Sequence, residues 1–178
     1  MKFRILLVFL TMFLFSNTSN SNESLTLYDF SFEDIDGNQV NLEKFTGKPV
    51  LVVNTASRCG YTPQYANLQN LFLEYKDSDL TIIATTSNSF YQEYDEVEDI
   101  KKICLVNYGV GFVTSSPMSV KGNDAHPLYT WINDVYGKKP KWNFFKFLFD
   151  RNGKLIESWS SMTKPDSSKI TKQIDELI

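Results

Sequence analysis

Apolar and polar positions along the chain follow two periods in turn, one typical of strands and one typical of helices. Leu25 to Ile35 alternates between the two kinds of residue and ends at Asp36-Gly37, which is a hairpin turn signal. Val50 to Val53 and Leu80 to Ala84 are short and almost continuously apolar, a pattern typical of strands buried on both faces. These two runs are therefore expected to lie side by side as parallel strands.

Four further stretches repeat apolar residues at helical spacing and are predicted to be helices. They run from Tyr65 to Tyr75, from about Asp95 to Val106, from about Pro127 to Val135, and from about Pro165 to Leu177. Thr62 is placed to cap the first helix, and Pro63 would then occupy its first helical position. This helix connects the two apolar strands as a β-α-β unit.

A second hairpin is predicted near the carboxyl end of the chain. The segments 145–149 and 154–159 flank Asn152-Gly153, the strongest short hairpin signal present. A parallel β-α-β half, an antiparallel hairpin and a closing helix together predict an α/β, thioredoxin-like fold with a central mixed β-sheet flanked by helices. Residues 25–178 contain no internal repeat or low-complexity linker, so they are expected to form one domain.

Residues 1–22 are predicted to be a secretory signal peptide. Met1 to Arg4 is positively charged, Ile5 to Phe15 is a nearly unbroken apolar run, and Ser16 to Ser24 is small and polar. The apolar run is about half of the ~20 residues that span a bilayer, so we expect no stable membrane span in the mature form, and an uncleaved anchor is the alternative. Cleavage between residues 16 and 24 predicts a periplasmic or secreted protein, in a compartment that favours disulfides.

Composition excludes several classes of function. The net charge is −3, and lysine and arginine are scattered rather than clustered, so nucleic acid is not expected as a partner. One histidine and two cysteines are too few for a multi-histidine metal site and do not favour a structural zinc cluster. We therefore expect neither a metal nor another cofactor.

Cys59 stands where a thiolate forms most easily. It lies in the loop between a central strand and the amino end of the next helix, where unpaired N–H groups and the helix dipole favour negative charge. Arg58 adds a neighbouring cation, and Gly60 leaves the loop backbone open to close approach. The alternative is that Cys59 is a small buried apolar residue with no chemical role.

Two long motifs in order resemble one enzyme family. The segment from Asn54 to Leu71, NTASRCGYTPQYANLQNL, resembles the active-site segment of glutathione peroxidases in their cysteine form. The segment from Lys141 to Lys154, KWNFFKFLFDRNGK, resembles the Trp-Asn-Phe segment and hairpin of the same family. The resemblance extends over the whole of residues 25–178, and it implies a peroxidase that reduces hydrogen peroxide or organic and lipid hydroperoxides.

The resemblance also implies roles for individual residues. Cys59 matches the peroxidatic cysteine, whose thiolate attacks the O–O bond and becomes a sulfenic acid. Gln92, Trp142 and Asn143 match the polar partners that donate hydrogen bonds to this sulfur and to the departing oxygen. The stretch 87–93 is one residue shorter than the family pattern and lacks its glycine, which leaves the position of Gln92 open.

Cys104 matches the resolving cysteine of thioredoxin-dependent members of the family. As such it would form a catalytic disulfide with Cys59, and the helix that carries it would have to fray so that the two sulfurs can meet. A thioredoxin-like protein or glutathione is then the expected reductant. The short stretch between Tyr129 and Lys141, where oligomeric members carry an insertion, implies a monomer.

Two alternatives to a peroxidase stay open at this point. A thiol–disulfide oxidoreductase would suit the fold and the compartment, but the chain lacks the Cys-x-x-Cys motif of that class. A redox-inert binding module would instead hold Cys59 and Cys104 in a static bridge.

Overall fold

The computed structural model describes residues 25–178, so the predicted signal peptide lies outside the described residues. A five-stranded mixed sheet with the order β5-β4-β3-β6-β7 forms its centre. Its strands are β3 (Val50–Thr55), β4 (Thr81–Thr86), β5 (Val113–Thr114), β6 (Lys146–Phe149) and β7 (Leu155–Trp159). β3, β4 and β5 run parallel, whereas β6 is antiparallel to both β3 and β7. The predicted thioredoxin-like fold with a mixed sheet is therefore confirmed.

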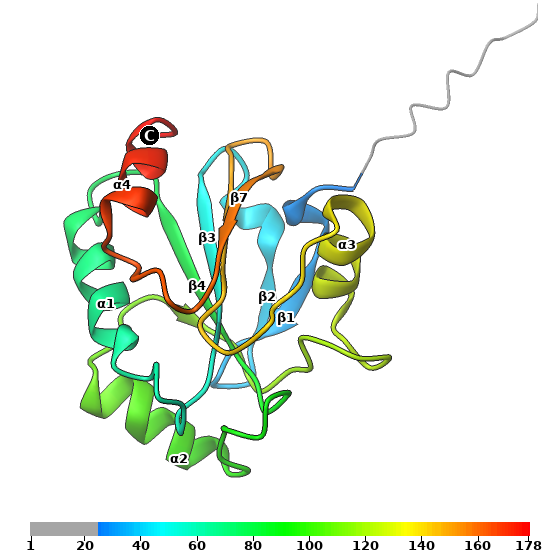
Figure 1. Ribbon diagram of the computed structural model, residues 1–178, viewed down its shortest axis with the longest axis vertical. Helices are drawn as coiled ribbons and strands as arrows, with labels where there is room; N and C mark the ends of the chain where they lie inside the picture. Colours follow the sequence, from blue (N-terminus) through cyan, green and yellow to red (C-terminus); the bar gives the residue numbers. More distant parts are fainter. Residues whose placement is uncertain (1–24) are drawn as a thin grey trace, which may run out of the picture.

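Helices cover both faces of the sheet (Figure 1). They are α1 (Gln64–Glu74), α2 (Val97–Lys101) with its π-helical continuation η3 (Lys102–Asn107), α3 (Pro127–Tyr136) and α4 (Ser168–Asp175). α1, α2 and α4 pack on one face, and α3 packs on the other together with the hairpin of β1 (Ser31–Glu33) and β2 (Gln39–Asn41). Two short 3₁₀ turns, η1 (Leu27–Asp29) and η2 (Leu42–Phe45), complete the second layer. Within residues 25–178, no helix has the length and apolar character needed to cross a bilayer.

The two-faced burial of β3 explains its continuous apolar run. Leu51 and Val53 join the apolar cluster under α1 and α4, whereas Val50 and Val52 join the cluster under α3. Every residue of β3 is buried. Because both faces are covered, neither of the two alternating sets of side chains on β3 faces water.

The predicted cap of the first helix is wrong. α1 begins at Gln64, and no side chain caps it. The Thr62 hydroxyl instead accepts a hydrogen bond from Cys59 N at 3.0 Å and donates one to Ala56 O at 2.9 Å. Thr62 therefore closes the loop that carries Cys59, because the chain reaches the helix through a turn that brings the hydroxyl back over the loop.

The second predicted helix is present but changes its winding. α2 starts at Val97, and from Lys102 the chain continues as η3, a π-helical segment that contains Cys104. Ile100 and Cys104 lie in the core with Val97 packed against them, as the apolar spacing predicts, but Leu105 packs there in place of the predicted Ile103. The wider π-helical turn explains this difference, because it rotates the residues that follow Lys102 relative to an α-helix. π-Helical turns are rare and occur often at functional sites.

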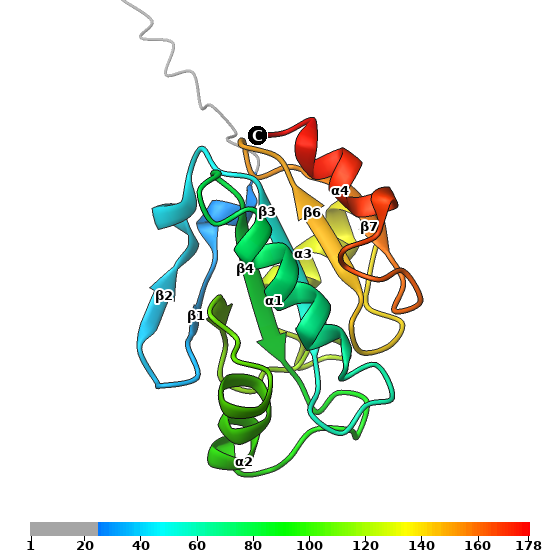
Figure 2. The ribbon, with the colours of Figure 1, turned by 90° about the vertical axis from the view of Figure 1, so that its left-hand side faces the viewer.

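Three connections meet at one end of the sheet. β3 and β4 both end there because they are parallel, and β6 begins there because it is antiparallel to β3. Figure 2 shows the β4 arrow pointing towards this end, next to α2. The loops that carry Cys59, Gln92 and Asn143 are therefore brought together by the sheet, far apart though they are in the sequence.

Candidate active site

Cys59 lies in a closed loop between β3 and α1. Its side chain is buried, with 6% of its surface exposed. The N–H of Tyr61 donates a hydrogen bond to Cys59 Sγ at 3.4 Å, and Thr62 closes the loop from the other side. A backbone N–H directed at sulfur is a donor that suits negative charge on that atom.

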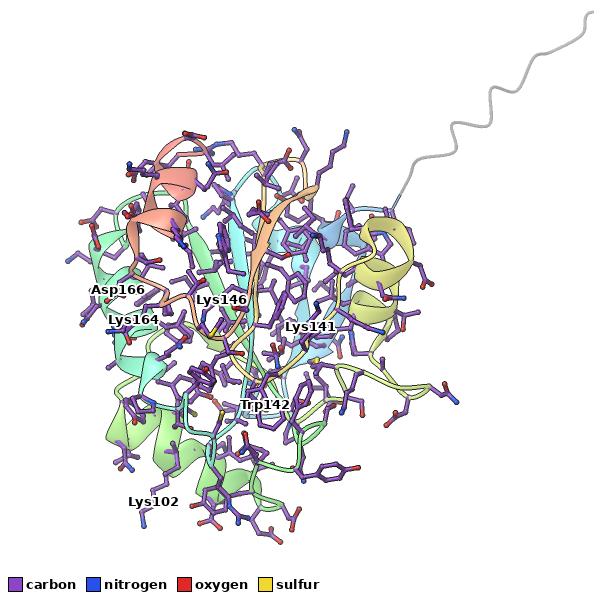
Figure 3. The ribbon with its side chains drawn as sticks, viewed as in Figure 1. Lys102, Lys141, Trp142, Lys146, Lys164 and Asp166 are labelled. Atoms are coloured by element: carbon purple, nitrogen blue, oxygen red, sulfur yellow. The ribbon has the colours of Figure 1, made fainter. Side chains whose placement is uncertain are left out.

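Gln92, Trp142 and Asn143 come together beside this loop. Asn143 Nδ2 donates to Gln92 Oε1 at 3.1 Å, and Arg58 N donates to the main-chain oxygen of Gln92 at 2.8 Å. The ring of Trp142, 41% exposed, lies 5.2 Å from the ring of Phe90 on the Gln92 loop. Figure 3 shows Trp142 near the end of the sheet that faces α2.

The predicted hydrogen bonds from Gln92, Trp142 and Asn143 to the Cys59 sulfur are not among the contacts of residues 25–178. Among residues 25–178, the hydrogen bond that Cys59 Sγ accepts comes from Tyr61, and Gln92 and Asn143 are bonded to each other instead. Asn143 Oδ1 is buried, and no hydrogen-bond partner for it lies within residues 25–178. Direct donation to Cys59 by the three side chains stays a prediction.

In the short loop before Gln92, one residue takes the left-handed backbone conformation, and Gln92 stays in the cluster. Tyr91 has a φ of 60° and is 89% exposed. A positive φ is uncommon for a residue with a side chain, and it falls where the family pattern has its glycine. The left-handed turn at Tyr91 accommodates the shorter loop, and the Gln92 side chain reaches Asn143.

Asn54, the fifth residue of β3, fixes the Trp142-Asn143 segment. Its Oδ1 accepts a hydrogen bond from Phe145 N at 3.0 Å, and its Nδ2 donates to Trp142 O at 3.1 Å. Phe144 between them has a φ of 62°. Asn54 was not among the predicted site residues, although an amide at the end of an apolar strand, fully buried here, needs partners and so signals a contact.

Glu93 is a second residue that the sequence analysis did not single out. Its carboxyl group is buried, and Oε1 accepts hydrogen bonds from Ser57 N at 3.0 Å and Tyr94 N at 2.9 Å. Burial raises its pKa, while these hydrogen bonds and the nearby Arg58 oppose the rise. Glu93 therefore ties the Cys59 loop to the chain that leads into α2.

Cys104 is buried in the same apolar cluster as Cys59. None of its surface is exposed, and burial raises the pKa of its thiol to about 11. Both cysteines are free. In this arrangement Cys59 lies in the loop after β3, and Cys104 is a buried, neutral thiol on η3.

A buried lysine supports the cluster from behind. Lys146 has no exposed surface, and its Nζ donates to Gln64 Oε1 at 2.5 Å and to Thr163 O at 2.7 Å. Gln64 Nε2 in turn donates to Ser161 O at 2.6 Å, and Ser161 Oγ donates to Asn143 O at 2.6 Å. Lys146 is thereby linked through three hydrogen bonds to the backbone of Asn143.

The arrangement can be compared with known proteins. The family model for glutathione peroxidase matches residues 27–133. The chain belongs to the glutathione peroxidase family. A glutathione peroxidase from Lactococcus lactis subsp. cremoris (strain MG1363) is 38% identical over 86% of this chain and 100% of its own length.

Other members of the family carry more specific names. The hydroperoxy fatty acid reductase gpx1 of Synechocystis sp. (strain ATCC 27184 / PCC 6803 / Kazusa) is 38% identical over 86% of this chain and 96% of its own length. The glutathione peroxidase-like peroxiredoxin gpx1 of Schizosaccharomyces pombe (strain 972 / ATCC 24843) is 41% identical over 78% and 91%.

Solved structures agree with the fold. The crystal structure of Trgpx in apo form superimposes with a TM-score of 0.69 at 34% identity, over 86% of this chain and 96% of that one. A thiol:disulfide interchange protein of the thioredoxin family from Chlorobium tepidum TLS has a TM-score of 0.62 at 16% identity, over 82% and 92%, which is a likeness of fold alone. Membership of the glutathione peroxidase family makes this protein a thiol peroxidase, acting on a hydroperoxide with a thiol reductant.

The buried amine of Lys146 should make stability depend on pH. Burial lowers the pKa of Lys146 from 10.5 to about 7, so between these values the unfolded chain binds a proton that the folded chain lacks. The free energy of unfolding should therefore rise with pH in this window, by at most about 1.4 kcal/mol per pH unit, and the gain should be lost as pH falls to about 7. Lys146→Met should remove the rise in urea denaturation curves.

Lys141, an exposed lysine on the same segment, provides the control. Lys141→Met should keep the slope of the wild type. A wild-type slope that survives in Lys146→Met would show that another group is responsible.

Proposed function

We propose that Cys59 is the peroxidatic residue and that Cys104 resolves its oxidised form. The Cys59 thiolate attacks one oxygen of the hydroperoxide, so that an S–O bond forms and the O–O bond breaks. The departing oxygen takes a proton and leaves as water or an alcohol, and Cys59 becomes a sulfenic acid. The observation that supports this best is the closed loop in which Tyr61 N donates to Cys59 Sγ beside the Gln92–Asn143 pair.

The amides and the indole beside the loop have a proposed task in this first step. Asn143 and Gln92 are joined at 3.1 Å, and a rotation of either side chain frees an N–H for the oxygen on which negative charge develops. The buried, unpartnered Oδ1 of Asn143 supplies an acceptor for the proton of an incoming hydroperoxide. Trp142 adds its indole N–H at the exposed edge of the site.

The second step consumes the sulfenic acid. Cys104 attacks the sulfur of Cys59, an S–S bond forms, and the S–O bond breaks. The hydroxide that leaves takes up the proton given by the Cys104 thiol and departs as water. A dithiol reductant of the thioredoxin type then reduces the disulfide and restores both thiols.

The substrate and the setting follow from the site and from the first 24 residues. Trp142 is partly exposed at the edge of the site, and a relative is named for hydroperoxy fatty acids. Fatty acid hydroperoxides are therefore proposed substrates alongside hydrogen peroxide. We further propose a monomer, because the stretch from Tyr129 to Lys141 is short, and export by the signal peptide at residues 1–22.

Cys59→Ser should abolish hydroperoxide turnover, because a serine hydroxyl does not form the thiolate that attacks the O–O bond. Steady-state peroxide consumption with a thioredoxin system measures the effect, and circular dichroism checks the fold. A variant that keeps more than about one tenth of the wild-type turnover rate would show that Cys59 is not the peroxidatic residue.

Cys104→Ser should separate the two steps. About one equivalent of peroxide per protein should still be consumed rapidly, after which the cycle should stall with Cys59 as a sulfenic acid that reacts with a dimedone-type probe. Wild type should instead give a Cys59–Cys104 disulfide in mass spectrometry. Wild-type turnover by the variant with a thioredoxin donor would mean that Cys104 is only a core residue.

The choice of reductant tests the disulfide. A dithiol protein completes the exchange within one complex, whereas glutathione needs two successive encounters. Turnover should therefore be at least about tenfold faster with a thioredoxin-like donor than with glutathione at equal thiol concentration. Equal rates with both would contradict the two-cysteine cycle.

A further inference from the structure

Two segments that carry the two cysteines are tied together by one buried carboxyl group. Glu93 Oε1 accepts a hydrogen bond from Ser57 N, two residues before Cys59, and another from Tyr94 N, on the way into α2. Glu93 is 3% exposed. Its own N–H donates to Asn88 Oδ1 at 3.1 Å, which fixes the residue within its loop.

Two more contacts follow the same path. Arg58 N donates to Gln92 O at 2.8 Å, and the Arg58 guanidinium lies over the ring of Tyr94, 5.5 Å from its centre. Together with the bond from Ser57 N to Glu93, these two contacts join residues 57–58 to residues 92–94. The Cys59 loop is therefore held to the start of the Cys104 segment by this short stretch of chain.

Several buried polar atoms around Glu93 lack good hydrogen bonds, which is unusual in a protein core. Buried side-chain atoms without a hydrogen-bond partner within residues 25–178 include Thr55 Oγ1, Ser57 Oγ, Tyr65 OH and Glu93 Oε2. Burial raises the pKa of Tyr65 well above its ordinary value, and a side-chain contact with Thr55 opposes the rise. Cys104 and Glu93 also lie close enough to Tyr65 to affect its pKa. The four atoms form two neighbouring pairs, Thr55 with Tyr65 and Ser57 with Glu93, that are close but lack good hydrogen-bond geometry. Such weakly paired polar atoms make the closed arrangement costly, and opening to water would satisfy them.

The segment on the far side of Glu93 is also suited to opening. α2 has only five residues before it passes into the π-helical η3, and Val106 in η3 is 76% exposed. Cys104 O accepts a hydrogen bond from Val110 N at 3.1 Å, which closes this segment on itself. Short, irregular segments with exposed apolar residues open locally at low free energy.

We propose that Glu93 is a positioning residue that acts as a clasp between the Cys59 loop and the Cys104 segment. While Oε1 holds Ser57 and Tyr94, Cys59 stays in its closed loop and Cys104 stays buried. Release of the clasp frees the Cys104 segment, so that Cys104 reaches the oxidised Cys59. This inference rests on the proposed resolving role of Cys104, and it adds the residue that controls the order of the two steps.

Three variants test the clasp. Glu93→Ala removes the acceptor, Glu93→Gln keeps an acceptor oxygen without the charge, and Glu96→Gln is the control, an exposed carboxylate three residues further on that makes no capping hydrogen bond. Two rates are measured in single turnover: oxidation of Cys59 by one equivalent of peroxide, and formation of the disulfide afterwards. Alkylation of Cys104 in the reduced, folded protein is the third readout.

The expected effects have opposite signs. In Glu93→Ala, oxidation of Cys59 should slow by about tenfold, because its loop loses an anchor, while disulfide formation and Cys104 alkylation should each quicken by about tenfold. Glu93→Gln should restore Cys59 oxidation to within about threefold of wild type. Glu96→Gln should match wild type in all three readouts.

Several results would overturn the proposal. One is Glu93→Ala with unchanged Cys104 alkylation, and another is both chemical steps slowed by the same factor. If Glu93→Ala does not fold, Glu93→Gln with a wild-type pattern supports the acceptor role, and Glu93→Gln with slow oxidation refutes it. Alkylation of Cys104 needs no peroxide, so it tests the clasp independently of the catalytic cycle. A wild-type protein that forms no disulfide would refute the proposed resolving role of Cys104 and leave the alkylation test of the clasp in place.

Discussion

The contact between Asn54 and the segment 142–145 is the constraint on which the site depends. The Asn54 side chain binds Trp142 O and Phe145 N, and its main-chain N–H donates to Phe145 O at 3.3 Å. β3 is buried on both faces, so Asn54 has no freedom to move relative to the sheet. Since Cys59 follows on the same chain, this contact sets where Trp142 and Asn143 stand with respect to the sulfur.

Polar groups that break the usual rules of burial gather around this contact. Lys146 is a fully buried amine, and within residues 25–178 none of the ion pairs includes it. Glu93 is a buried carboxyl group, and one of its oxygens lacks a hydrogen-bond partner among residues 25–178. Each unsatisfied buried group costs about 1–3 kcal/mol. Natural proteins tolerate such costs chiefly at functional sites, where the surrounding fold offsets them.

The sequence predicted the elements whose evidence is local. The β3 run, the Asn152-Gly153 hairpin and the helix at α3 each carry their own pattern, and all three are present. α4 begins at Ser168, three residues later than the position suggested by Pro165, because a proline marks only the neighbourhood of a helix start. Local pattern also gave a wrong cap at Thr62, whose hydroxyl makes its hydrogen bonds within the Cys59 loop rather than at the start of α1.

The site was predicted only where a motif covers it. Cys59, Gln92, Trp142 and Asn143 were identified by resemblance, and the structure brings the last three together. Asn54, Glu93 and Lys146 act through partners 36 to 91 residues away in the chain, which no local pattern encodes. Glu93 stood beside a predicted site residue, yet its burial became visible only once β3 and β4 were placed side by side.

The burial of Cys104 suits the order of events in the proposed cycle. A thiol reacts with peroxide as its thiolate, and burial raises the pKa of Cys104 to about 11. In the proposed cycle, Cys104 would therefore be protected from peroxide while Cys59 is still reduced, and only one sulfenic acid would form. The same burial prevents a disulfide until the segment opens. In the proposed cycle, selectivity between the two cysteines would come from packing rather than from a difference in the residues themselves, and the contacts that hold η3 closed would set the rate of disulfide formation.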